Sequence, residues 1–307
     1  MRRSISLLAA CLVSFGLAAP LDQDSKLGDV DILNYALTLE FLESKFYSEG
    51  LSNFTEANFL DAGFSKEFYK NLKGISQDEK DHVAFLSTAL GDKAIKEPSF
   101  AFPVKDAASF VGLSSVLEGV GVSAYLGAAP AITNKDYLTA AGSILTVEAR
   151  HASYIRAALK QKPFPAAFDT PLGFNQVFSL AAQFVTGFAE GTKVPFKPFP
   201  KLTAVPSSGD KFCAGKGSVT FKDAQGENKP DKVYAVFYSG LETYYVQVTN
   251  SGDKDYTASI PGPDFATKGQ SAPKGQTYVV LSTADGKDTK ANDENIIAGV
   301  GILEIGC

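Results

Sequence analysis

The two histidines of this sequence are the residues whose spacing points most directly to chemistry. Each follows a glutamate by three positions, in the pairs Glu79/His82 and Glu148/His151, within stretches of helical apolar periodicity. Side chains three residues apart lie about one turn apart on the same helix face, so both members of a pair reach toward one point. A carboxylate and an imidazole placed in this way are typical metal ligands. The two pairs together predict metal binding, whereas either pair alone is more often a surface salt bridge.

Two further glutamates stand where core residues are expected. Glu40 falls in the middle of the apolar stripe of residues 33–47, and Glu118 is the only Asp, Glu, Lys, Arg or His between residues 107 and 133. A bare carboxylate in apolar surroundings costs several kcal/mol, so each must be protonated, paired or metal-bound. Glu43, one turn after Glu40, is expected beside the site or in solvent rather than as a ligand. The central Glu and the Gly and Ser content of residues 107–133 disfavour a membrane span there.

The patterning divides the chain into a helical part and a β-rich part. Helices are predicted at about residues 33–47, 66–90, 107–133 and 136–159, with a short fifth helix at 174–184. A proline-rich segment then follows that cannot continue a helix, and beyond it β-branched and aromatic runs alternate with turn residues. The sequence therefore predicts an α+β multidomain protein with an up-down four-helix bundle in residues 29–190, a linker in residues 191–206 and an antiparallel β-sandwich in residues 207–307.

These residues resemble a known ligand set. One Glu from each of two helices and Glu-x-x-His from each of two others is the arrangement of the di-iron and di-manganese carboxylate bundles. Leu33-Asn34 with Glu40 resembles the first helix of bacterioferritins, and Leu117-Glu118 with residues 121–127 resembles the third helix of the plant desiccation-related group. Residues 31–184 thus resemble the ferritin-like superfamily, and more closely its secreted fungal and plant members of the late-sexual-development and desiccation-related group. The resemblance implies metal ligands at Glu40, Glu79, His82, Glu118, Glu148 and His151.

Charge balance sets the expected cofactor. Four ionised carboxylates in an apolar bundle repel one another, and two divalent cations neutralise them while both imidazoles stay uncharged. Oxygen-rich ligation with one His per metal favours iron, with manganese as the alternative, and a four-coordinate zinc ion uses such a site less fully. We expect ferroxidase, oxidase or catalase-like chemistry, among which the sequence does not choose. Tyr47 and Tyr125, each seven residues after a predicted ligand, either face the metals or are core aromatics like Tyr35 and Tyr154.

The ends of the chain predict export. A basic tip and a short apolar run in residues 1–18 end in small residues, which is typical of a cleaved signal peptide and predicts a secreted protein without a transmembrane segment, extracellular or in the cell wall. In an oxidising compartment Cys213 and Cys307 are expected to form a disulfide. Asn53 begins an N-glycosylation sequon. The net charge of −5 argues against nucleic acid as a partner.

Three classes of function follow from these observations. The first is an extracellular di-metal protein with redox activity toward iron or peroxide. In the second, the metals only stabilise the bundle of a protein that serves stress tolerance, development or the cell wall. In the third, the sandwich recognises a glycan or a protein partner. The aromatic residues Tyr234, Tyr238, Tyr244 and Tyr245 are compatible with glycan stacking, although such residues more often pack within a sheet.

Overall fold

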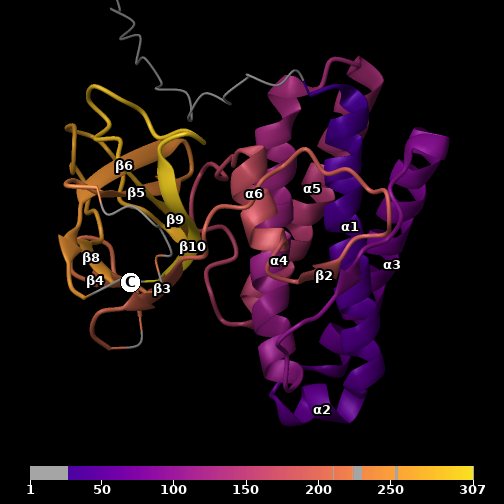
Figure 1. The fold of residues 1–307 in the computed structure, drawn as a ribbon. Helices are drawn as coiled ribbons and strands as arrows, with labels where there is room; N and C mark the ends of the chain where they lie inside the picture. The colour runs from indigo at the N-terminus through magenta and orange to yellow at the C-terminus, as the bar shows by residue number, and fades with distance from the viewer. Residues whose placement is uncertain (1–26, 210, 223, 225–229, 253–254, 307) are drawn as a thin grey trace, which may run out of the picture.

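The helical region is a bundle of four long helices, α1 (Asp29–Asn53), α3 (Lys66–Leu90), α4 (Ala107–Ala128) and α5 (Lys135–Ala158) (Figure 1). The computed structural model describes residues 27–209, 211–222, 224, 230–252 and 255–306. The short α2 (Glu56–Asp61) joins α1 to α3, and α6 (Phe174–Ala181) packs against α4. The predicted fold class, helices followed by antiparallel sheets, is confirmed.

Local capping explains where the long helices begin and end. The side chains of Ser65, Asp106 and Asn134 accept hydrogen bonds from backbone N–H groups in the first turns of α3, α4 and α5. These groups have no partner within the helix itself, so the caps satisfy them. At the other end of α3, Gly91 has a φ of 54°, in the left-handed region that favours glycine. The capping residues therefore fix where these helices begin and where α3 ends.

The helix directions differ from the expected up-down order, because α3 and α4 run parallel to each other. Asn34 near the start of α1 donates to the carbonyl of Lys93 just after α3 (3.0 Å), so α3 runs antiparallel to α1. Asp29 at the start of α1 accepts from the Thr133 hydroxyl just before α5 (2.8 Å), so α5 runs parallel to α1. Phe110 at the start of α4 packs on Gly50 at the end of α1, so α4 runs parallel to α3. The segment 91–106 allows α3 and α4 to run parallel because it returns along the length of the bundle between them in the chain.

The return segment is held in place by a small strand pair. Its strand β1 (Ser99–Phe100) pairs with β2 (Val185–Gly187), which follows α6. Single turns of 3-10 helix, η1 (Gly91–Lys93) and η2 (Ala129–Ala131), extend α3 and α4. The sequence did not predict this pair, since two strands of two or three residues leave no periodic signal.

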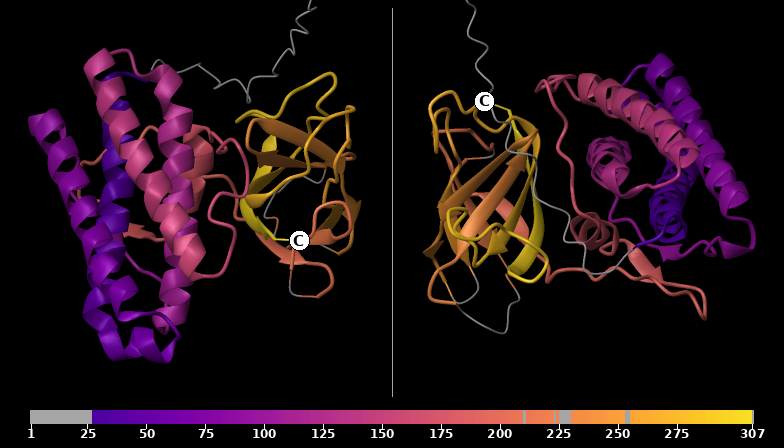
Figure 2. Two further views of the ribbon diagram at one scale, coloured as in Figure 1. Left: turned by 180° about the vertical axis from the view of Figure 1, so that it is seen from behind. Right: turned by 90° about the horizontal axis from the view of Figure 1, so that it is seen from above.

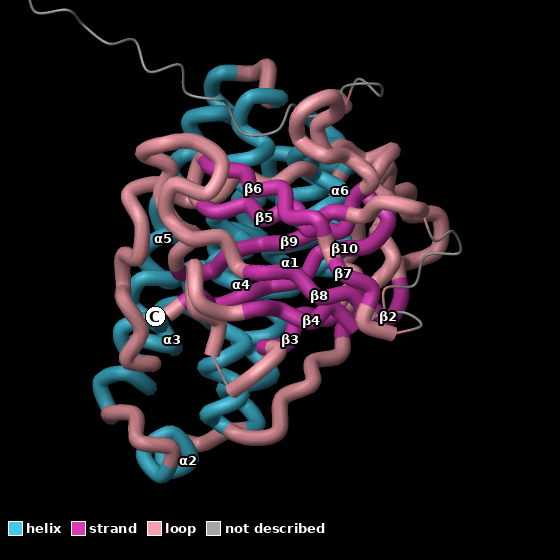
Figure 3. The backbone as a smooth tube through the Cα atoms, turned by 90° about the vertical axis from the view of Figure 1, so that its left-hand side faces the viewer, coloured by secondary structure: helices cyan, strands magenta, loops and turns pink. Residues whose placement is uncertain are grey.

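The C-terminal region consists of two four-stranded antiparallel sheets that share an apolar core, and Figure 3 shows their strands in front of the helices. The inner sheet has the strand order β10-β9-β5-β6 and the outer sheet the order β3-β4-β8-β7. Strand β3 lies within the segment assigned above to the linker. The strands are β3 (Thr203–Pro206), β4 (Ser218–Lys222), β5 (Tyr234–Ser239), β6 (Glu242–Gln247), β7 (Thr249–Asn250), β8 (Tyr256–Ser259), β9 (Gly275–Ser282) and β10 (Ile296–Ile305).

Both faces of the inner sheet are buried. Side chains alternate between faces along a strand, and Val236, Tyr238 and Tyr278 join the core shared with the helices, whereas Phe237 and Val279 join the core between the sheets. The molecule therefore has three layers, with the inner sheet between the bundle and the outer sheet (Figures 1 and 2). Of the four tyrosines considered for glycan stacking, Tyr238 and Tyr244 are buried and Tyr234 and Tyr245 are half-buried. They do not form an exposed aromatic platform.

Polar contacts fix the inner sheet on α4. The Tyr278 hydroxyl donates to the carbonyl of Gly119 (2.8 Å) and lies 2.8 Å from the Ser123 hydroxyl, and the Gln276 amide donates to the carbonyl of Val116 (3.1 Å). A Cβ on Gly119 would lie 2.5 Å from the Gln276 side chain, so a larger residue there would displace the Gln276 amide from α4. The residues of α4 that make these contacts lie in the sequence on either side of Glu118, one of the predicted metal ligands.

Among the described residues, one helix passes a length and composition test for crossing a membrane. This is α4 with its following turn, Ala107–Ala131, with a mean hydropathy of 1.4. In the protein 67% of its apolar window is buried, because neighbouring helices and the inner sheet pack on it. Its apolar character is that of a core helix.

The residues of the predicted signal peptide, disulfide and glycosylation site lie in the sequence at or beyond the ends of the described helices and strands. Residues 1–18 and Cys307 lie outside the described residues. Phe212, next to Cys213, forms a bridge with Ile305, and the Gly306 amide donates to the Phe212 carbonyl (3.4 Å). Asn53 is exposed at the last residue of α1, where the helix meets the turn that precedes α2.

We predict that Arg156→Met lowers the free energy of unfolding by about 2 kcal/mol, because it removes a largely buried paired charge. The Arg156 guanidinium on α5 donates two hydrogen bonds to the Glu304 carboxylate on β10, at 2.8 and 2.6 Å. Chemical denaturation measures the change. Arg150→Met, at an exposed position of the same helix, is the matched control. Equal losses in the two variants would contradict an ion pair that fastens the two regions together.

Candidate metal centre

The six predicted ligands meet in the middle of the bundle. Glu40 comes from α1, Glu118 from α4, and the pairs Glu79/His82 and Glu148/His151 from α3 and α5. All four carboxylates are 0% exposed, and both imidazoles are buried. Each helix places its acidic side chain inward because that position falls on the apolar stripe which packs against the other helices. Ligation itself remains a prediction, but the structure brings all six residues together.

The donor atoms form two overlapping groups. One consists of Glu40, Glu79, His82 and Glu148, and the other of Glu79, Glu118, Glu148 and His151. Within each group the ligand atoms lie within 4.8 Å of one another. Glu79 and Glu148 belong to both groups, so their carboxylates stand between two potential cation positions. This arrangement suits two adjacent metal ions, each with its own His and its own outer Glu.

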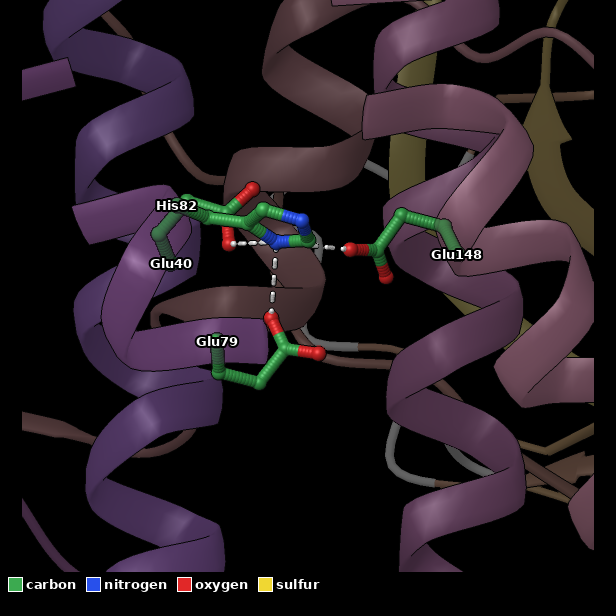
Figure 4. A group of neighbouring side chains, drawn as sticks. All are labelled: Glu40, Glu79, His82 and Glu148. Carbon is green, nitrogen blue, oxygen red and sulfur yellow. Dashed lines mark hydrogen bonds and ion pairs between the residues drawn. The ribbon is translucent and has the colours of Figure 1, made fainter. Parts of the chain in front are cut away.

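Each imidazole directs the same nitrogen at the site. His82 Nδ1 lies 3.1 Å from Glu40 Oε2, 3.2 Å from Glu79 Oε2 and 3.4 Å from Glu148 Oε1 (Figure 4). His151 Nδ1 lies 3.1 Å from Glu79 Oε1 and 3.2 Å from Glu118 Oε2. One N–H cannot donate well to several oxygens at once, whereas a cation among them is attracted to all of them.

Several donor atoms are left without a hydrogen-bond partner among the residues that the structure describes. They are Glu79 Oε1, Glu118 Oε2, His151 Nδ1 and both carboxylate oxygens of Glu148. Buried polar atoms are rarely left unsatisfied, so this cluster requires a partner such as an ion. Atoms bound about 2.1 Å from one ion lie about 3.0 Å apart at neighbouring corners of an octahedron. The His-to-carboxylate separations of 3.1–3.4 Å fit that spacing.

Two tyrosines hold the outer carboxylates reciprocally. Tyr47 on α1 donates its hydroxyl to Glu118 on α4, and Tyr125 on α4 donates to Glu40 on α1. Each tyrosine lies seven residues after the glutamate of its own helix, so the two helices contribute equivalent pairs. Of the two alternatives for these tyrosines, the structure shows that they face the site through the carboxylates.

Asp78 has a role that the sequence analysis missed. Its carboxylate lies 3.1 Å from His151 Nε2, the ring nitrogen that points away from the site, although the Asp78 side chain is half-exposed. An acceptor at Nε2 fixes the ring and leaves Nδ1 directed at the other ligands. An acidic residue directly before Glu-x-x-His was the available signal, but the partner histidine lies on a different helix.

Glu43 is buried beside the site without belonging to either donor group. A Cβ built on Gly121 would lie 3.3 Å from Glu43 Oε1 and 2.8 Å from Glu148 Oε2. The absence of a side chain at Gly121 therefore leaves the room that both carboxyls occupy. Burial raises the pKa of Glu43 well above its usual value, and the neighbouring acidic groups, Glu148 first among them, raise it further.

The metal-free site keeps its charges balanced with protons. Burial disfavours imidazolium, but contacts with Glu148, Glu40 and Glu79 outweigh it and raise the pKa of His82 to about 12. Contacts with Glu118 and Glu79 likewise outweigh burial and raise the pKa of His151 to about 11. Burial raises the pKa of Glu79 to about 7 against the opposing effect of both histidines. Burial and repulsion by Glu79 raise the pKa of Glu148 well above its usual value.

Comparison with known proteins agrees with this geometry. Residues 28–161, less than half of the chain, match the family model of the Ferritin-like domain. The helical region is ferritin-like. Protein rds1 of Schizosaccharomyces pombe is similar to this chain, with 28% identity over 178 residues. That alignment covers 58% of this chain and 44% of the yeast protein, so the chain spans less than half the length of this relative.

We predict that the metal-free protein loses stability as the pH rises from about 5 to about 8.5. Glu43, Glu79 and Glu148 have pKa values raised in the folded state, so above about pH 4.5 the folded protein holds protons that the unfolded chain has lost. His82 and His151 hold theirs above pH 6.5, up to about 12 and 11. All five shifts have the same sign. Denaturation midpoints in the presence of a chelator measure the trend.

The metal-loaded protein provides the control for this pH dependence. Divalent ions bound among these residues would displace their protons, so Mn²⁺ should stabilise the protein more at high pH than at low pH. A metal-free midpoint that rises across this pH range would contradict the proton-balanced site.

We predict that Asp78→Asn weakens metal binding by about ten-fold or more, because His151 loses the acceptor that orients its ring. Competition with a chromophoric chelator measures the dissociation constant. Asp81→Asn is the matched control, since Asp81 is exposed on the same helix and its carboxylate accepts from Gln77 rather than from a histidine. Equal affinities in the two variants would show that Asp78 does not support the site.

Proposed function

We propose that this protein binds two divalent metal ions in its ferritin-like region, and that iron is the natural metal, with manganese as the alternative. The observation that carries the proposal is the pair of donor groups that share Glu79 and Glu148. Four carboxylates and two divalent cations sum to zero charge once both imidazoles are neutral. The oxygen-rich donor set favours iron or manganese over zinc.

When bound, two redox-active ions supply electron transfer to or from dioxygen, peroxide or iron, which supports ferroxidase or catalase-like activity as the proposed chemistry. The residues of the chain prepare the site for it. Tyr47 and Tyr125 hold the outer carboxylates in place, and Asp78 holds His151. Leu37, Leu72 and Ile155 of the surrounding core are fully buried. The cofactor positions are thereby built from groups that need little reorganisation.

A second candidate function is purely structural. Each long helix contributes at least one donor, so two bound ions would cross-link all four helices without turnover. In that case the protein serves stress tolerance, development or the cell wall as a metal-stabilised scaffold. The same geometry supports both functions, and oxygen-dependent chemistry separates them.

We further propose that the protein is secreted, like the fungal and plant proteins that its sequence resembles, and that it carries a Cys213–Cys307 disulfide. The backbone pairing of Phe212 with residues 305 and 306 supports the disulfide, since it brings the neighbours of both cysteines together. Thiol titration of the denatured protein, with and without reductant, tests this pairing.

We predict that wild-type protein binds about two metal ions per chain and that Glu118→Ala and His151→Ala each reduce this to about one or less, with helix content retained. Each variant removes a donor that belongs to one group only. Elemental analysis measures the stoichiometry and circular dichroism the helices. Glu67→Ala, at an exposed position of α3, is the control. Equal metal content in all four proteins would contradict the assignment.

The redox proposal has a separate readout. After anaerobic loading with Fe²⁺, admission of oxygen should produce an optical change in the wild type that Glu118→Ala lacks. Bound iron that raises the melting temperature without such a change would favour the structural function.

A further inference from the structure

A cavity of about 330 Å³ lies between the bundle and the sandwich. Leu39 and Leu42 of α1 and Val120 of α4 line it from the bundle, Leu180 of α6 from one side, and Ala204 and Val300 from the sheets. A single water needs only about 10–15 Å³, and pockets for small organic molecules begin at about 300 Å³. The space is therefore of the size of an organic ligand rather than of a water or dioxygen molecule.

The inner end of this cavity touches the metal centre. Glu43 and Gly121 line it there, and both are buried. Because Gly121 has no side chain, Glu148 Oε2 lies only 2.8 Å from the place where its Cβ would stand. The Glu148 carboxylate, which belongs to both donor groups, is thus separated from the cavity only by Gly121 and the Glu43 side chain.

This is the point where the two equivalent halves of the site differ. Glu40 and Glu118 match each other, as do Tyr47 and Tyr125, yet the position three residues after the glutamate is Glu43 on α1 and Gly121 on α4. A side chain at residue 121 would close the approach to Glu148. Glu43 and Gly121, the two positions that break this symmetry, both line the cavity.

The outer end of the cavity differs chemically from its body. Gln183 and Lys201 line it and are exposed, so the cavity opens to solvent on their side. The body is lined mainly by aliphatic side chains, with Phe184 as its one aromatic. An apolar chain of modest width suits such walls, and an anionic head suits the lysine at the mouth.

We propose that this cavity binds an aliphatic carboxylate, with its head at Lys201 and its chain pointing toward Gly121 and the metal centre. If the proposed redox function holds, aliphatic carboxylates are the class of organic compound that binds next to the metal centre. Binding itself depends on the cavity and not on the metal, so the two proposals fail separately.

Calorimetric titration of decanoate and decan-1-ol into the full-length, metal-free protein tests the site. Saturable binding of both is expected. Ala204→Phe, which fills the cavity from strand β3, should weaken both by ten-fold or more. Lys201→Met should weaken decanoate several-fold and leave decan-1-ol unchanged, whereas Lys197→Met, at an exposed position outside the cavity, should change neither. Absence of saturable decanoate binding to the wild type, or equal affinity in Ala204→Phe, would overturn the proposal.

Two additions keep the test decisive. If Ala204→Phe does not fold, Val116→Phe fills the cavity from a half-buried position of α4 and should have the same effect. In protein loaded with Mn²⁺, the paramagnetic ion should broaden the terminal methyl carbon of labelled decanoate more than its carboxyl carbon. Stronger broadening at the carboxyl carbon would overturn the proposed orientation.

Discussion

The burial of acidic groups in a dry core is the constraint on which the rest of this structure depends. Five glutamates, residues 40, 43, 79, 118 and 148, lie within the bundle, and repulsion among them is countered by protonation and by positive charge. Protons on His82 and His151 supply part of this charge in the metal-free state, and two divalent ions would supply all that the four carboxylates of the predicted ligand set need. Because the acids come from different helices, whatever neutralises them also holds the helices together.

Helix α4 transmits this constraint to the rest of the molecule. It carries Glu118 to the site, and its residues Val116, Gly119 and Ser123 contact the inner sheet through Gln276 and Tyr278. Small residues allow the close contacts, since added side chains at Gly119 and Gly121 would collide with the sheet on one side and with the acidic cluster on the other. The C-terminal region is therefore a structural neighbour of the centre, and not a module attached through a flexible linker.

The parts that the sequence could predict are those encoded by local spacing. Glu-x-x-His pairs, isolated carboxylates in apolar stripes and alternating strands are all patterns that span a few residues. The sequence could therefore predict the bundle, the sheets and the six candidate ligands. The parallel course of α3 and α4, the contact of Asp78 with His151 and the burial of Tyr238 depend on segments distant in the chain. Periodicity along one element carries no information about which face of another element it meets. The sequence did not predict the cavity for the same reason, because five separate elements line it.

The inner sheet also has a consequence for how the chain assembles. Neither face of this sheet is in contact with water. Its side chains pack against the outer sheet on one side and against α4 and α6 on the other. During synthesis the helices emerge first, and their apolar surface toward the sheet stays uncovered until β9 and β10 arrive. The ferritin-like core thus completes its folding only after the later β-strands have docked, which makes the tail an internal folding partner of the region that precedes it.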